Sequence, residues 1–198
     1  MDNNHNKIST IKLLKYLLLA VLTVFATSAC SQNKTPRSME KKKVLVVYFS
    51  ATGNTRQVAR QIADIAEADI CEIVPVKPYS DADLVWTNQQ SRSSVEMSHP
   101  EARPEINAVS VNVRKYDYVF LGYPIWWDLA PRTVNTFIEA ASLEGMTVIP
   151  FATSGSSNIA NSVDVLKESY PKVNWQTGKL LNRASGKEID SWVSDMIK

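Results

Sequence analysis

Residues 44–55 have the sequence VLVVYFSATGNT and join two different structural signals. The first six residues are continuously apolar and rich in valine, which predicts a strand buried on both faces of a sheet. The last six are small, and four of them bear a hydroxyl or amide group. Gly53 permits a positive φ or a close backbone approach. Because an apolar helical stripe follows over residues 55–66, the loop predicts a cradle of N–H groups for an anion at a helix start.

The rest of the chain continues this alternation of strand and helix. Apolar runs predict further strands over 70–74, 118–122 and 146–151 and near Leu180 and Leu181, and periodicity predicts helices from Pro131, over 158–169 and over 186–197. Residues 81–98 are polar and predict a long loop with a short helix. The alternation predicts one α/β domain with a doubly wound parallel sheet and helices on both faces. Ligands bind such sheets outside the carboxyl ends of the strands.

Two more strand ends bear residues suited to a ligand. The third strand is followed by Tyr123, Pro124, Ile125, Trp126 and Trp127. Adjacent tryptophans are costly to expose, so we expect one to pack on a flat ligand and the other in the core.

The fourth strand is followed by Thr153, Ser154, Gly155 and Ser156, a turn rich in hydroxyl groups. Each of the three strand-end segments taken alone also fits an ordinary turn that caps the next helix. Three of them at successive strand ends favour a binding site.

The segment Ser50-Ala51-Thr52-Gly53-Asn54-Thr55 resembles the phosphate loop of flavodoxins, whose pattern is S/T-x-T-G-x-T. The matching residues are Ser50, Thr52, Gly53, Asn54 and Thr55. In that family, hydroxyl groups and backbone amides hold the phosphate of flavin mononucleotide (FMN) without a basic residue. The resemblance implies a flavodoxin-like domain over residues 43–198, with FMN as cofactor and a five-stranded parallel sheet in the order 2-1-3-4-5.

The other two strand ends resemble the flavin-contacting loops of flavodoxin-like reductases. This implies that residues 123–127 meet the isoalloxazine ring, with backbone amides at its polar edge, and that residues 153–156 form a third flavin loop. Relatives usually have a second glycine where Ser156 stands. Arg92, His99, Arg103 and Pro104 resemble part of a loop that roofs the flavin in one subfamily, although we expect Arg92 and His99 to be solvated surface residues.

Residues 1–29 have the features of an export signal. Three lysines precede an apolar run over 16–26, and small residues then lead to Cys30. This arrangement resembles a bacterial lipoprotein signal, in which the chain is cleaved before the cysteine and the thiol is lipidated. Thr27 departs from the pattern, because an aliphatic residue is commoner there.

Two alternatives are ordinary secretory cleavage and an uncleaved anchor helix, although the apolar run is short for a membrane-spanning helix. Residues 30–42 are mostly polar and predict a flexible tether. The predicted location is the cell envelope, with the chain anchored to a membrane through lipid on Cys30.

Composition excludes several other classes of protein. Hydrophobic residues make up 44% of the 198 residues and charged residues 21%, so a packed core is expected. From Cys30 onward, 19 basic residues face 19 acidic ones, and a neutral domain lacks the field of a nucleic-acid binder. Two cysteines far apart and two histidines give no metal-binding motif. Cys71 lies in a predicted strand and is expected to be a buried packing residue.

The sequence therefore predicts an FMN-binding redox protein. It would either transfer electrons to a redox partner or act as an FMN-dependent oxidoreductase on a small acceptor such as a quinone. No set of catalytic side chains is evident, so the flavin would supply the redox chemistry. The alternative is an exported scaffold of the same fold that binds another ligand without redox turnover. No motif identifies the electron donor or the oligomeric state.

Overall fold

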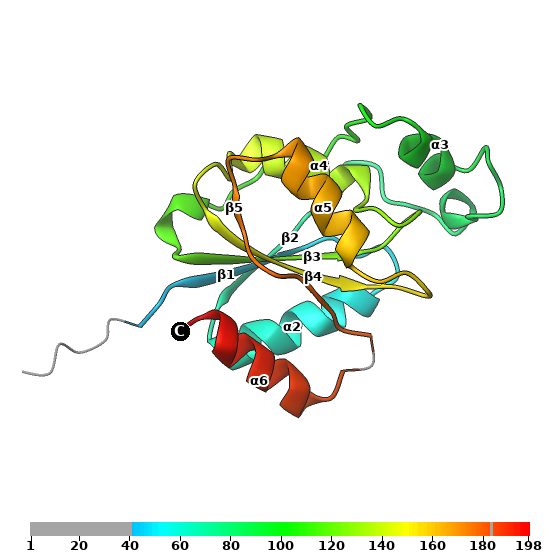
Figure 1. Cartoon of the computed structure of the whole chain (residues 1–198). Helices are drawn as coiled ribbons and strands as arrows, with labels where there is room; N and C mark the ends of the chain where they lie inside the picture. The colour runs from blue at the N-terminus through cyan, green and yellow to red at the C-terminus, as the bar shows by residue number, and fades with distance from the viewer. Residues whose placement is uncertain (1–40, 183) are drawn as a thin grey trace, which may run out of the picture. The chain divides into compact units, whose positions relative to one another are not determined.

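The computed structural model describes residues 41–182 and 184–198, shown in colour in Figure 1. The predicted export signal and the predicted lipidation site at Cys30 lie outside these residues. Within the described part of the chain, no helix has the length and apolar character needed to cross a membrane.

The centre of the domain is a parallel sheet built around β1 (Val44–Tyr48), whose five residues are all buried. This strand pairs with β2 (Asp69–Glu72) on one side and with β3 (Tyr118–Pro124) on the other. Next to β3 lies β4 (Thr147–Thr153). The described strands follow the order β2-β1-β3-β4-β5, which confirms the predicted fold.

Helices cover both faces of the sheet. In Figure 1, α2 (Asn54–Ala66) and α6 (Gly186–Met196) lie on one face, and α4 (Arg132–Ala141) and α5 (Ala160–Ser169) lie on the other. Side chains of β1 alternate between the two cores that these helices close. Burial on both faces explains why this strand is apolar at every position rather than at every second one.

The fifth position of the sheet is divided between two short strands. The first, β5 (Asn174–Trp175), pairs with the start of β4, and β6 (Lys179–Leu180) pairs with its end. Ile149 and Pro150 of β4 lie between the residues paired with β5 and those paired with β6, and Pro150 has no N–H to donate. The short strand expected near Leu180 is therefore present as β6, whereas β5 was not predicted.

The connection between β2 and β3 is long and contains three short helices. These are η1 (Ala82–Leu84), α3 (Arg92–Ser98) and η2 (Val113–Lys115). β2 ends before the expected strand does, because the chain after it pairs elsewhere through an antiparallel bridge between Pro75 and Ile106. Ser91 caps α3 by accepting a hydrogen bond from the Ser94 N–H.

Candidate functional site

The loop between β1 and α2 has the geometry of an anion cradle. Gly53 has a φ of 92°, in the left-handed region that favours glycine. Its N–H donates to Ser50 Oγ at 3.1 Å, which closes the loop. Because α2 begins at Asn54, the first N–H groups of this helix have no partner within the helix and face the loop.

A buried pair of hydroxyl groups joins this loop to the loop after β4. Thr55 Oγ1 and Thr153 Oγ1 lie 2.8 Å apart, and one donates to the other. The contact links residues 98 positions apart in the sequence. It holds the first and third predicted ligand loops in a fixed relation.

The loop after β3 turns back on itself in two residues. Trp126 and Leu129 exchange two backbone hydrogen bonds of 2.9 Å, and the residues between them, Trp127 and Asp128, have φ values of 46° and 64°. Two consecutive positive φ values define a type I′ turn, which favours Asn and Gly. A tryptophan in this conformation is strained. The turn is held to α5 by Asn161 Nδ2, which donates to the Asp128 carbonyl at 3.1 Å.

The two tryptophans have different environments. Trp126 packs edge-on against Phe49 and Tyr79, with ring centroids 5.6 and 5.2 Å away. Trp127 is 45% exposed. The structure therefore places Trp126 against the core and leaves the Trp127 indole accessible.

The long β2–β3 connection supports Trp126 through Tyr79. The Arg92 guanidinium lies 4.1 Å from the centre of the Tyr79 ring and pairs with Glu96 at 2.6 Å. The Tyr79 hydroxyl donates to Glu96. Burial, followed by this carboxylate, raises the pKa of Tyr79, so the phenol stays protonated. Arg92 is thus a packed structural residue, which corrects the expectation of a solvated one, whereas His99 is exposed.

The loop after β4 is closed by its own hydroxyl group and by a residue that the sequence did not reveal. Ser154 Oγ accepts from the N–H groups of Ser156 and Ser157 at 3.2 and 2.9 Å. Asn182, after β6, accepts from the Ser154 N–H at 2.7 Å and donates back to the Ser154 carbonyl. Asn182 lies just past β6, at the carboxyl edge of the sheet where the predicted loops also lie. This position is the signal that could have identified it.

These segments surround one pocket of about 770 Å³ at the carboxyl edge of the sheet. Eight of the predicted site residues line it: Thr52, Asn54, Pro124, Ile125, Trp126, Thr153, Ser154 and Gly155. Six further described residues that were not predicted also line it: Gln57, Val58, Gln61, Leu181, Asn182 and Ala184. The latter come from α2 and from the segment after β6.

The remaining predicted residues lie around this pocket rather than in its lining. Ser50 and Thr55 are buried. Tyr123 is fully buried, and its hydroxyl lies 3.1 Å from Ser162 Oγ, so only its backbone remains for a ligand at this edge. Trp127 and Ser156 are exposed.

No lysine or arginine is among the described residues that line the pocket. The nearest cation in sequence, Arg56, pairs with Glu72 at 2.6 Å, and the Tyr48 hydroxyl donates to the same carboxylate at 3.0 Å. Among the described residues, the groups that could hold a phosphate in this loop are its hydroxyl and N–H groups and the dipole of α2. These groups fit the phosphate of a flavin nucleotide.

The described residues contain no group of three His, Cys, Asp or Glu side chains placed to hold a metal ion. Cys71 is a free cysteine and is partly exposed, a small correction to the expected burial. Burial, and then the charge of Glu72, raises the pKa of its thiol. A protonated thiol is a poor nucleophile, and Cys71 is not among the described residues that line the pocket.

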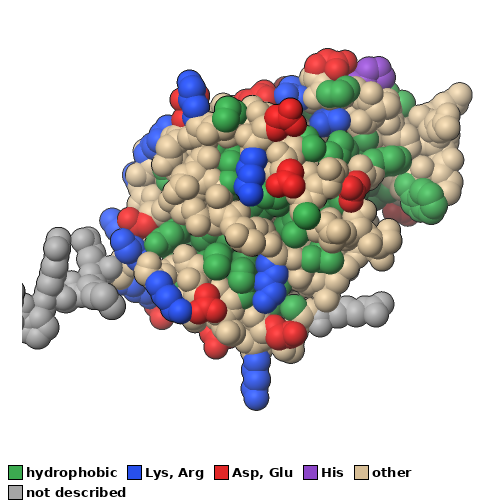
Figure 2. Space-filling view, in the orientation of Figure 1, with side chains coloured by type: hydrophobic (Ala, Val, Ile, Leu, Met, Phe, Trp, Pro, Cys, Tyr) green, Lys and Arg blue, Asp and Glu red, His purple; other side chains and the backbone are tan. Residues whose placement is uncertain are grey.

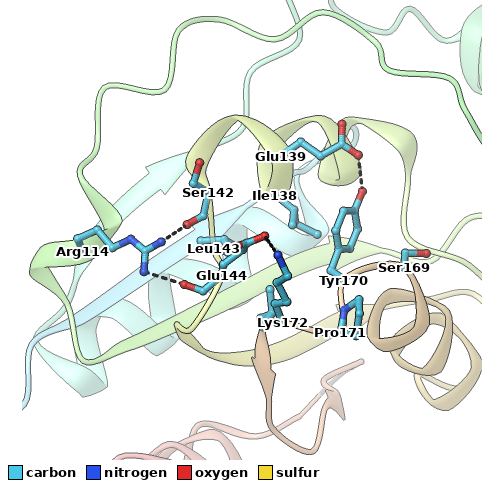
Figure 3. A pocket seen from close by; sticks show the side chains of 11 residues that line it. Arg114, Ile138, Glu139, Ser142, Leu143, Glu144, Ser169, Tyr170, Pro171 and Lys172 are labelled. Carbon is cyan, nitrogen blue, oxygen red and sulfur yellow. Dashed lines mark hydrogen bonds and ion pairs between the residues drawn. The ribbon is translucent and has the colours of Figure 1, made fainter.

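A second pocket, of about 610 Å³, lies at the opposite, amino edge of the sheet (Figure 3). Its polar groups satisfy one another. Arg114 donates to the carbonyls of Glu144 and Ser142 at 2.7 and 2.9 Å, and the Tyr170 hydroxyl donates to Glu139 at 2.8 Å. None of the described residues that line it was predicted to bind a ligand.

A doubly wound parallel sheet with the strand order 2-1-3-4-5 is the flavodoxin-like fold. The chain belongs to the flavodoxin family, because the family model described as Flavodoxin matches residues 43–196. A comparison with curated proteins finds no match.

Solved structures include close relatives of the domain. A protein described as a flavoprotein from Bacteroides eggerthii is 54% identical, with a TM-score of 0.75 over 78% of this chain and 98% of its own. Another from Bacteroides uniformis is 47% identical, with a TM-score of 0.75 over 78% and 99% of the two chains. In both cases the match spans nearly the whole of the crystallised chain.

A flavoprotein from Lactobacillus acidophilus, solved in complex with FMN, shares the fold. It is 22% identical, with a TM-score of 0.64 over 79% of this chain and 99% of its own.

Proposed function

We propose that this chain is an FMN-dependent redox protein of the cell envelope. The observation that carries the proposal is the meeting of three loops, from β1, β3 and β4, around one pocket at the carboxyl edge of the sheet. Membership of the flavodoxin family and the FMN complex of a protein with the same fold support the choice of ligand.

The residues divide into two groups by role. The β1–α2 loop would hold the phosphate, with Thr52 and Asn54 at the pocket wall. The loops after β3 and β4 would hold the ring. Trp126 and Gly155 line the pocket, and the exposed Trp127 follows Trp126 in the chain. Bound FMN supplies the electron-transfer chemistry, and these residues position it and exclude water from one side.

Reduction of a small acceptor, such as a quinone, fits the charges better than electron transfer to a protein. From Cys30 onward the basic and acidic residues balance at 19 each, so no net field would steer a charged protein partner. The face in Figure 2 accordingly shows both signs of charge among neutral side chains. The sequence pattern at Cys30 supports attachment to a membrane through lipid.

Purification under conditions that retain cofactors tests the proposal. The expected result is a flavin absorbance at about one equivalent per chain, with FMN as the flavin released on denaturation. Anaerobic titration should then show reversible bleaching. A protein that fails to bind added FMN would instead be a scaffold for another ligand.

The role is tested by stopped-flow mixing of the reduced holoprotein with a short-chain quinone. Fast, saturable reoxidation is expected of a quinone reductase. Slow reoxidation without saturation would favour electron transfer to a redox partner instead.

A further inference from the structure

The chain enters the domain at the edge of the sheet opposite the proposed flavin site. Lys41 is the first described residue, and β1 begins at Val44. The loop that would bind phosphate follows the other end of β1. In a parallel sheet all strands share this direction, so the two edges are separated by the strand length, about 17 Å for five residues.

The amino edge bears a basic pocket of about 680 Å³. Five of its lining residues are cationic, namely Lys41, Lys42, Lys43, Arg114 and Lys115, and two are acidic, Glu67 and Asp69. Lys and Arg side chains gather on the left of Figure 2, next to the start of the described chain. This local excess of positive charge contrasts with the equal numbers of basic and acidic residues from Cys30 onward.

The carboxylates in and beside this pocket do not balance its cations. Glu67 pairs with Lys41, and Asp69 accepts from the Tyr116 hydroxyl at 2.7 Å, a bond that raises the pKa of Tyr116 to about 12. A third carboxylate, Asp117, accepts from the backbone N–H of Lys43 at 2.8 Å. Counting it, the local excess is two positive charges.

The other cations have no acidic partner. Within the described residues, Lys42, Lys43 and Lys115 form no ion pair. Arg114 donates only to the carbonyl oxygens of Ser142 and Glu144, as Figure 3 shows, so its charge is not neutralised. These cations suit the phosphate groups of an anionic membrane surface.

We propose that the amino-edge pocket docks on the anionic headgroups of the membrane to which Cys30 anchors the chain. This inference rests on the lipid anchor of the proposed function. Ten residues, 31–40, separate Cys30 from Lys41, and they reach about 35 Å at most. The tether therefore holds this edge close to the bilayer and raises the effective concentration of weak contacts.

The docked orientation places the flavin edge toward water. An acceptor would then reach the proposed flavin site from the aqueous phase rather than from within the bilayer. This narrows the substrate class to water-soluble acceptors, including quinones with short side chains.

Vesicle binding by residues 41–198 tests the docking surface without the anchor. This part has its own core, and the crystallised Bacteroides relatives span little else. We expect binding to phosphatidylglycerol-containing vesicles that weakens with salt, and no binding to phosphatidylcholine alone. Lys42→Gln, Lys43→Gln and Lys115→Gln together should weaken it about a hundredfold, since each lysine contributes on the order of fivefold.

The matched control removes three lysines outside the pocket: Lys77→Gln, Lys167→Gln and Lys187→Gln. It should bind nearly as well as the unmodified domain. Equal losses in both triple variants, or no preference for anionic vesicles, would overturn the proposal. Flavin absorbance of each variant distinguishes this failure from failure of the proposed function, because FMN binding at the far edge should be unaffected.

Orientation is tested in the full, lipidated chain with Cys71 replaced by serine. A fluorophore is attached at Lys198→Cys, beside the amino edge where the Lys198 carbonyl accepts from the Tyr118 hydroxyl, or at Gln89→Cys in the β2–β3 connection. Nitroxide lipids should quench the first label and spare the second. Equal quenching, or the reverse order, would contradict the docked orientation.

Discussion

The hydroxyl groups of the β1–α2 loop differ in burial and in hydrogen bonding, although the sequence motif does not distinguish them. Thr52 is exposed at the wall of the pocket, whereas Thr55 is 1% exposed and bonded to Thr153. Residues 50–55 contain no lysine or arginine, and Arg56, which follows them, is paired with Glu72. In the proposed function, the hydrogen bonds of this loop contribute to phosphate affinity, and the contribution of each is measurable.

Thr52→Ala should weaken FMN binding about tenfold and leave the melting temperature of the apoprotein unchanged. A hydrogen bond to a charged group contributes roughly 1.5–3 kcal/mol, and 1.4 kcal/mol is tenfold. Titration with FMN and with riboflavin checks this, because riboflavin lacks the phosphate. Equal losses for both ligands would mean that the phosphate lies elsewhere.

Thr55→Ala should destabilise the apoprotein itself. It leaves the buried Thr153 hydroxyl without its partner, at a cost of about 1–3 kcal/mol. Urea denaturation of the apoprotein measures the loss. Thr55→Ser is the control, since it keeps the hydroxyl group and should remain close to the unmodified protein.

Trp127 combines exposure with backbone strain, which is the combination expected where a residue is kept for a ligand. Trp127→Asn should raise the stability of the apoprotein by about 1 kcal/mol, because asparagine tolerates positive φ. The same change should weaken FMN binding by removing a stacking surface. Thermal melts and FMN titration check the two effects. Stabilisation without any loss of FMN affinity would place the ring away from Trp127.

At the scale of elements, β3 and β4 meet at a contact that only glycine allows. Gly122 lies opposite Phe151, and a Cβ at Gly122 would overlap the buried Phe151 ring. Gly122→Ala should therefore cost more than the usual 1–3 kcal/mol of an overpacked core, as measured by denaturation. Adding Phe151→Leu should recover part of the loss.

Gly155, in the loop after β4 that we propose to contact the flavin, is the matched control. A Cβ there would meet nothing within 4 Å, so Gly155→Ala should leave the apoprotein stable. A loss of FMN affinity in this variant alone would report a close approach of the ligand to the backbone. If neither stability nor affinity changes, this loop lies farther from the flavin than the proposal requires.

The sequence predicted those elements whose patterns are local, such as β1 and the helix after it. It did not predict the packing of Arg92 against Tyr79, because that contact depends on a loop with no periodicity. The divided fifth strand follows from Pro150 in the neighbouring strand, an effect across the sheet rather than along the chain. Asn182 was missed for the same reason, since its role is to hold the backbone of Ser154.

At the scale of the whole molecule, the parallel sheet gives the domain two edges with different chemistry. The carboxyl edge holds a pocket lined, among the described residues, without a cation, and the amino edge holds five cations around another. Since the chain enters at the basic edge, the proposed membrane anchoring and the proposed flavin binding would lie at opposite ends of the strands. The two activities can then be altered independently.

Cys30→Ser in the full chain should release most of the protein from membranes. Two or more acyl chains bind a bilayer stably, so under the proposed lipidation of Cys30 the change removes the main source of membrane affinity. The fraction that remains bound at low salt should fall further when Lys42, Lys43 and Lys115 are also changed to glutamine, because only electrostatic contacts are left. Fractionation of cells into membrane and soluble parts, repeated at low and high salt, measures both steps. Full retention of the Cys30→Ser protein would show that residues 16–26 act as an uncleaved anchor helix, and release by the lysine changes alone would show that the lipid contributes little.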